Sequence, residues 1–124
     1  MENGIIPVSA AEVLSAAFVT AQQRFESVQL TGMNVDFSHF ATLADIIRAT
    51  RPALNAAGFY LSFDVVQGDG NVTAVAVLTY KGGDTLSGPN ITIDIKDSLA
   101  IAITEAERIS LSSLLGIAAI EEDK

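Results

Sequence analysis

The side chains best suited to chemistry in this sequence are a small set of cations. Seven Lys and Arg residues stand against fifteen Asp and Glu residues. Cations of this kind can contact phosphate groups, because they displace the counterions condensed on a nucleic-acid backbone. The candidates for DNA contact, with the single histidine included, are Arg48, Arg51, Lys81, Lys96, Arg108 and His39.

Three of these candidates also have a structural interpretation. His39 could contact a phosphate or a base, or it could be a solvated or capping residue of a polar loop. Arg51 could contact DNA, pair with Asp45, or cover apolar surface with its aliphatic stem. Arg108 follows two nearby glutamates, so it could belong to a surface ion network or contact DNA.

Catalytic and metal-binding patterns are missing from the sequence. The chain has no cysteine and one histidine, which excludes thiolate metal sites and leaves no recognisable ligand spacing. No G-x-S-x-G motif surrounds a serine, and the paired glycines lack the lysine of a phosphate loop. We therefore expect no enzymatic activity, no metal and no cofactor.

The charge balance limits the partners. The formal net charge is −8, so the monomer repels DNA on average. An acidic surface of this kind suits a basic protein partner. No apolar run approaches the roughly 20 residues that span a bilayer, and no basic, apolar leader opens the chain. The sequence predicts a soluble, intracellular protein without a membrane partner.

Hydrophobic periodicity predicts two helices in the first half of the chain. Ser9 and Glu12 form a capping-box pattern before a helix over residues 10–28. Residues 29–40 show no sustained period and indicate a loop. A second helix is expected over residues 41–57, with Pro52 either kinking it or starting a new helix near Arg51.

The second half predicts strands and a last helix. Residues 59–66 and 72–80 flank a turn-rich break and should form an antiparallel hairpin. A third strand is expected over residues 91–95, and a helix from Asp97 or Ser98 to Leu115, ending at Gly116. The expected fold is α+β, in the order α-α-β-β-β-α, with an antiparallel three-stranded sheet packed by helices. It forms one domain, 1–124, with an N-terminal arm at 1–8 and an acidic tail at 119–124.

Two segments carry a family resemblance. Residues 43–58 read LADIIRATRPALNAAG, and residues 102–118 read AITEAERISLSSLLGIA, followed by Glu121-Glu122-Asp123. In this order they resemble the ERF (essential recombination function) family of phage single-strand annealing proteins, over approximately residues 14–123. The resemblance implies a compact α+β domain that assembles into rings or filaments and holds single-stranded DNA in a basic, partly aromatic groove, in the cytoplasm of a bacterial host.

The chain departs from that family at several basic and aromatic positions. Where the family tends to have Tyr-Ala-Arg-Arg-Tyr, this chain has Glu105-Ala106-Glu107-Arg108-Ile109. Residues 37–40 lack the two lysines that are usual in that loop. Each missing aromatic removes a stacking surface worth about 1–3 kcal/mol per base.

Two functions follow from these observations. The first is a phage-type single-strand DNA annealing or recombination protein that acts as an oligomer. The alternative is an acidic ERF-like relative that no longer binds DNA and binds a basic protein partner through Glu105 and Glu107, as an inhibitor or DNA mimic. Apolar residues on both faces of the expected strands favour a homo-oligomer in either case.

Overall fold

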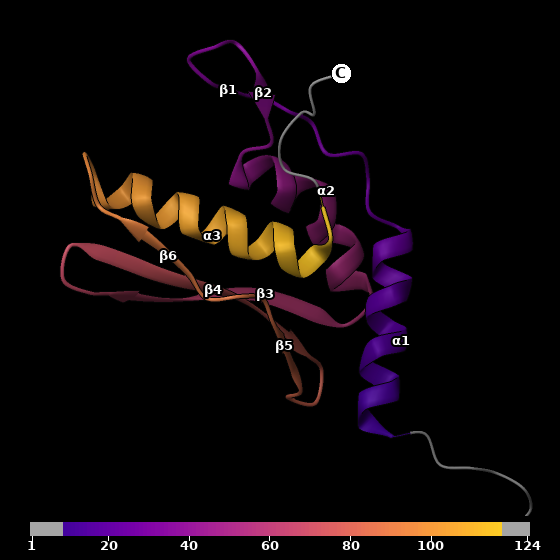
Figure 1. The fold of residues 1–124 in the computed structure, drawn as a ribbon. Coiled ribbons are helices and arrows are strands. Elements are labelled where there is room, and N and C mark those ends of the chain that lie inside the picture. The colour runs from indigo at the N-terminus through magenta and orange to yellow at the C-terminus, as the bar shows by residue number, and fades with distance from the viewer. Residues whose placement is uncertain (1–8, 118–124) are drawn as a thin grey trace, which may run out of the picture.

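The computed structural model describes residues 9–117, so the arm at 1–8 and the tail at 119–124 lie outside the described residues. The fold is α+β. Within these residues, helices α2 (Leu43–Ala56) and α3 (Leu99–Leu115) lie on one side of an antiparallel sheet, α1 (Ala10–Gln23) stands beside the end of that sheet next to α2, and a small second sheet projects from the body (Figure 1).

Helix α1, Ala10–Gln23, begins at the predicted capping box but ends five residues earlier than expected. Ser9 accepts a hydrogen bond from the Glu12 amide, and the Glu12 carboxylate accepts one from the Ser9 amide. After Arg24 the chain leaves the helix and runs past helix α2 (Leu43–Ala56), where the Glu26 amide donates to the Ala49 carbonyl at 3.0 Å. Phe25 and Val28 therefore contact the core from a segment that is not helical, although their spacing predicted a helix.

The segment predicted as a loop contains a hairpin. Strands β1, Gly32–Met33, and β2, His39–Phe40, pair in antiparallel register and project away from the body (Figure 1). Gly32 must be a glycine, because a Cβ there would lie 2.5 Å from the Phe40 ring. Two-residue strands give no detectable alternation, so a sequence period could not reveal them.

Helix α2, Leu43–Ala56, is continuous through Pro52. The expectation that a new helix starts near Arg51 is wrong. Pro52 is exposed, and it removes one amide donor from the ladder. The buried side chains of Ala49, Thr50 and Leu54 hold the helix against the core on both sides of it.

The main sheet has four strands, so the predicted three-stranded sheet is wrong in number. The strands are β3, Phe59–Gln67; β4, Asn71–Tyr80; β5, Thr85–Ser87; and β6, Ile91–Asp94. The predicted hairpin of β3 and β4 is confirmed, with Phe63 opposite Ala76 at its middle. The additional strand, β5, has three residues and pairs with the end of β4 next to the turn, while β6 pairs with its beginning.

Helix α3, Leu99–Leu115, crosses the sheet above β4 (Figure 1). As predicted, it ends at Gly116, whose φ of 72° is a left-handed conformation that glycine adopts without strain. Beneath α3, alternate residues of β4 are fully buried, namely Val72, Ala74, Ala76 and Leu78. The opposite face of the sheet carries no helix among residues 9–117, and its β4 side chains remain half-buried.

Candidate functional site

Two adjoining hollows lie along the first half of α3. The first, called here the apolar hollow, has a volume of about 360 Å³ and is lined by Phe40, Thr42, Leu43, Ala100, Ile101, Thr104, Glu105 and Arg108. The second, the charged hollow, has a volume of about 460 Å³ and is lined by Thr92, Ile93, Asp94, Lys96, Asp97, Ser98, Ile101, Ala102 and Glu105. Ile101 and Glu105 line both hollows, which therefore adjoin along one side of α3. The two hollows together are called here the groove.

The start of α2 fixes one wall of the apolar hollow. Thr42 caps the helix by accepting a hydrogen bond from the Asp45 amide, and Asp45 accepts one from the Thr42 amide at 2.9 Å. The same carboxylate accepts from the amide and hydroxyl of Thr31. Burial by itself raises the pKa of Asp45, but these hydrogen bonds outweigh it, and the pKa lies well below the ordinary aspartate value. A carboxylate therefore ties the base of the hairpin to α2 and holds Phe40 beside α3.

A buried serine fixes α3 against the sheet. The Ser110 hydroxyl accepts a hydrogen bond from the Ala76 amide at 2.8 Å and donates to the Pro89 carbonyl at 2.7 Å. A Cβ at Gly88 would lie 2.6 Å from the Ser110 carbonyl oxygen, so only glycine permits this approach. These contacts set the height of α3 above β4 and therefore the position of the groove on its outer side.

Arg108 is held between an aromatic ring and a carboxylate. Its guanidinium carbon lies 5.4 Å from the centre of the Phe40 ring. Its Nε donates to one oxygen of Glu105 at 3.1 Å, and its second terminal nitrogen donates to the other oxygen. The Arg108 side chain is 11% exposed and that of Glu105 is 41% exposed. Of the two nearby glutamates, Glu105 is the one that pairs with Arg108; the arginine is the covered member of this pair and the glutamate is the more exposed one.

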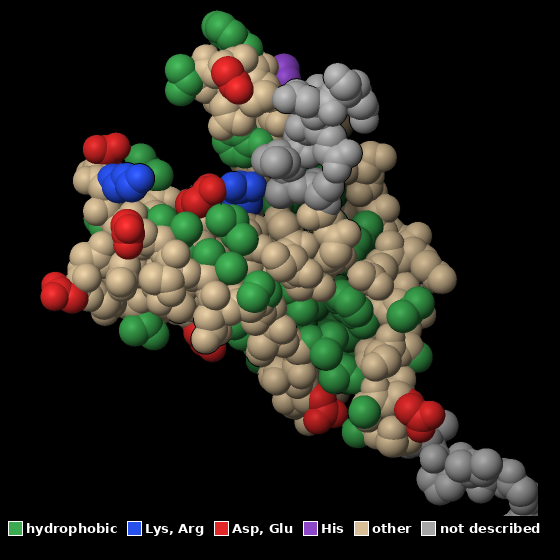
Figure 2. Space-filling view, in the orientation of Figure 1, with side chains coloured by type: hydrophobic (Ala, Val, Ile, Leu, Met, Phe, Trp, Pro, Cys, Tyr) green, Lys and Arg blue, Asp and Glu red, His purple; other side chains and the backbone are tan. Residues whose placement is uncertain are grey.

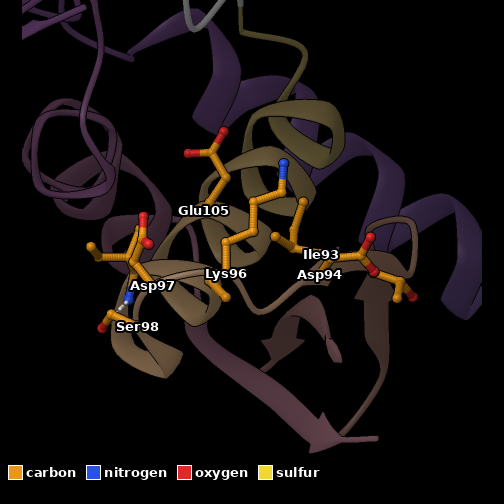
Figure 3. Close-up of a pocket in the computed structure, with 9 residues that line it drawn as sticks. Ile93, Asp94, Lys96, Asp97, Ser98 and Glu105 are labelled. Carbon is orange, nitrogen blue, oxygen red and sulfur yellow. Dashed lines mark hydrogen bonds between the residues drawn. The ribbon is translucent and has the colours of Figure 1, made fainter. Parts of the chain in front are cut away.

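Lys96 lies in the charged hollow among carboxylates. Figure 3 shows the Lys96 ammonium group and the Glu105 carboxylate pointing toward the same side of the hollow, with Asp94 and Asp97 to either side. Within residues 9–117, Lys96 forms no salt bridge. Lys96 and Arg108 are therefore the two predicted cations that the fold brings to one groove.

The remaining predicted cations lie elsewhere. Arg48 pairs with Asp45 at 3.3 Å, and within residues 9–117 no salt bridge joins Asp45 to Arg51, so the pairing considered for Arg51 is made by Arg48. Arg48 and Arg51 instead line a separate hollow on α2. Lys81 follows β4 at the end opposite to the charged hollow, with its ammonium 5.8 Å from the Tyr80 ring centre. His39 is half-buried in β2.

The two glutamates proposed for partner binding differ in position. Glu105 lines both hollows, whereas Glu107 lines neither. Glu107 is half-buried, and burial raises its pKa above the ordinary glutamate value. Glu105 is therefore the one of the pair that faces the groove.

Several groove residues were not predicted from the sequence. Ile101 is 67% exposed. From the sequence, Phe40 is expected only as part of a loop, Asp97 only as a candidate helix start, and Asp94 only as part of a strand. Charged residues and apolar residues lie next to each other on this face (Figure 2). The one available signal was the position of Ile101 three residues after the cap candidate Ser98, in the first turn of the predicted helix, which commonly remains solvent-exposed.

The hairpin tip is a second exposed apolar feature. Val35 is 99% exposed and Phe37 is 76% exposed, and hydrophobic side chains gather at this end of the molecule (Figure 2). Phe37 has a φ of 69°, which is unusual for a bulky side chain. The Ser38 hydroxyl donates to the Asp36 carboxylate at 2.7 Å, and hydrogen bonds from Ser38 lower the pKa of Asp36. The tip is thus held by its own hydrogen bonds.

Residues 9–117 contain no group of three or more His, Cys, Asp or Glu side chains that could hold a metal ion. Within the same range, each helix is too short or too polar to cross a membrane. No protein-family model, curated protein or solved structure matches this chain.

Proposed function

We propose that this chain is a single-strand DNA annealing or recombination protein of phage type that acts as an oligomer. One observation carries the proposal. The two segments that resemble the ERF family, residues 43–58 and 102–118, are far apart in the sequence, yet both line the apolar hollow. Leu43 comes from the first segment, and Thr104, Glu105 and Arg108 come from the second.

The chemistry of that hollow suits a single strand. Exposed bases stack on aromatic rings and on guanidinium planes, and nearby cations offset the backbone charge. Phe40 and Arg108 provide the ring and the guanidinium, and Lys96 lies in the adjoining charged hollow. The carboxylates in the same groove oppose this binding. We therefore expect weak binding that depends strongly on salt and is strengthened when several copies act on one strand.

A titration of a fluorescent oligothymidylate by anisotropy at several salt concentrations tests the proposal. Arg108→Gln and Phe40→Ala should each weaken binding by about tenfold, because a stacked base contributes about 1–3 kcal/mol. Lys96→Gln should reduce the salt slope by about one unit. Lys81→Gln is the matched control, since it removes the same charge at the far end of the sheet and should leave binding unchanged.

Two results would contradict the proposal. The first is an absence of binding at the lowest salt concentration with all variants folded. The second is binding that responds to Lys81→Gln and ignores the groove variants. Circular dichroism and thermal unfolding of each variant separate a loss of binding from a loss of fold.

A second candidate function is favoured by the carboxylates. Asp94, Asp97 and Glu105 lie around the exposed Ile101, which suits a protein segment that presents basic residues beside an apolar anchor. In this function Glu105 is the recognition group. In the first function it competes with phosphate for Arg108.

Glu105→Gln distinguishes the two candidates, because they predict opposite signs. If the groove binds single strands, removing the carboxylate frees Arg108 and should raise oligothymidylate affinity several-fold. If the groove binds a basic partner, the same variant should lower the affinity for a designed peptide of alternating lysine and leucine. A variant that binds both probes as the unchanged protein does would exclude Glu105 from the site.

A further inference from the structure

Strand β3 is a sheet edge without the usual protection. Among residues 9–117 it pairs with β4 alone, and it is nine residues long. Natural proteins shield such edges with lysine, proline, bulges or very short strands, since a bare edge pairs with other chains. The β3 sequence FYLSFDVVQ contains no lysine, proline or glycine, and Asp64 is its one charged residue. Three of its side chains are also exposed and apolar, namely Tyr60, Val65 and Val66.

The other edge of the sheet differs in each of these respects. It is divided between β5 and β6, which have three and four residues. Gly88, Pro89 and Asn90 separate them, and Pro89 has no amide donor to offer. The β5/β6 edge is therefore poorly suited to pairing, and β3 is the edge that can accept another strand.

The hydrogen-bond phase of β3 shows which backbone groups are available. The Gly68 amide donates to the Asn71 carbonyl at 2.8 Å. Because hydrogen-bonded pairs alternate along an antiparallel ladder, the even-numbered residues of β3 direct their backbone N–H and C=O groups to β4. The intervening residues direct their N–H and C=O groups away from the sheet. For Leu61, Phe63 and Val65, these groups have no partner among residues 9–117.

We propose that β3 pairs in antiparallel register with β3 of a second copy of this chain, on a two-fold axis at Phe63. In this register the outward-facing N–H and C=O groups of one copy lie opposite those of the other. Phe63 pairs with its own equivalent, and Leu61 pairs with Val65 of the second copy. Each such pair exchanges two hydrogen bonds. The two four-stranded sheets then form one continuous sheet.

The side chains match in the same register. Tyr60 lies opposite Val66 on the helix-free face, where they are 60% and 67% exposed. An aromatic side chain opposite a β-branched one is a favourable cross-strand pair. Ser62 lies opposite Asp64, so the carboxylate meets a hydroxyl group instead of the other carboxylate. A register shifted by two residues in either direction shortens the paired length and loses the Tyr60–Val66 contact.

This assembly does not depend on DNA binding. The groove along α3 adjoins β6, which lies at the sheet edge opposite to β3. Pairing at β3 therefore leaves the groove open. The consequence for the proposed function is that two grooves belong to each assembly, which supplies the multiple contacts that a weak single-strand site requires.

Cysteine cross-linking tests the register directly, because the chain has no cysteine of its own. Ser62 and Asp64 are both exposed, and in the proposed register they face each other across the axis at about 4.5 Å between Cα atoms. That distance lies within the range that a disulfide spans. Each residue is about 7–8 Å from its own equivalent, which is too far. A mixture of Ser62→Cys and Asp64→Cys chains should form heterodimers under mild oxidation, while each variant by itself stays uncross-linked.

Sedimentation velocity provides the second measurement. The unchanged protein should have twice the 13.0 kDa chain mass, and Val65→Pro should be monomeric, because the amide that it removes faces the second copy and not β4. Val65→Thr is the matched control and should remain dimeric. A monomer at every concentration would overturn the proposal. So would an oligomer in which the mixture gives no more cross-linking than the single variants, and this outcome leaves the test of single-strand binding unaffected.

Discussion

Helices α2 and α3 each carry an acid and an arginine three residues apart, and the two pairs are buried in opposite senses. In α2 the Asp45 side chain is 2% exposed and its partner Arg48 is 69% exposed. In α3 the Arg108 side chain is 11% exposed and its partner Glu105 is 41% exposed. The same spacing therefore produces a buried anion in one helix and a covered cation in the other.

The neighbours of each pair explain the difference. Asp45 occupies the third position of α2, where the amides of the N-cap residue Thr42 and of Thr31 point at its carboxylate. Arg108 lies in the middle of α3, where amides are already paired and the Phe40 ring covers the guanidinium. Asp45 therefore ties Thr31, at the base of the hairpin, to α2, and the Arg108–Glu105 pair shapes the groove.

The largest effect should come from the buried anion. Asp45→Ala leaves donors of Thr31 and Thr42 without an acceptor, and we expect the free energy of unfolding to fall by about 3 kcal/mol. Asp45→Asn keeps one acceptor oxygen and should cost less. Urea denaturation followed by circular dichroism measures both, and a change below about 1 kcal/mol for the alanine variant would contradict the role of this carboxylate.

The same residue should make stability depend on pH. The pKa of Asp45 is lower in the folded protein than in the unfolded chain, so its contribution is fully present above the unfolded pKa of about 4. That contribution is lost progressively as the pH falls below this value. Melting temperatures measured from pH 7 down to pH 3 should therefore drop more steeply for the unchanged protein than for Asp45→Asn. Parallel curves would contradict the assignment.

The two arginines should differ by a smaller amount. Arg108→Gln removes a covered guanidinium with its ring contact and two hydrogen bonds, and should cost about 1–2 kcal/mol of stability. Arg48→Gln removes an exposed partner and should cost less than about 0.5 kcal/mol. The two variants are matched in chemistry and in spacing to the acid. If urea denaturation gave equal losses of unfolding free energy for the two variants, the difference in burial between the two arginines would have no effect on stability.

Local patterns in the sequence were sufficient for much of the fold. Capping residues and terminal glycines act on neighbouring backbone groups, so the start of α1 at Ser9 and the end of α3 at Gly116 were predicted correctly. The β3–β4 hairpin was predicted because alternation and a turn signal occur together there. The β1–β2 hairpin and β5 were missed, because strands of two or three residues have no measurable period and depend on the partners they meet.

The sequence by itself therefore determined the α+β class, most helix and strand positions, the acidic charge and the short supply of cations. Tertiary structure decided which cations share a groove, since Lys96 and Arg108 meet there while Lys81 lies at the far end of β4. It also decided the sense of burial of the two acid–arginine pairs. Short-range rules act on a residue and its near neighbours, whereas burial and proximity depend on which distant segment packs above a side chain.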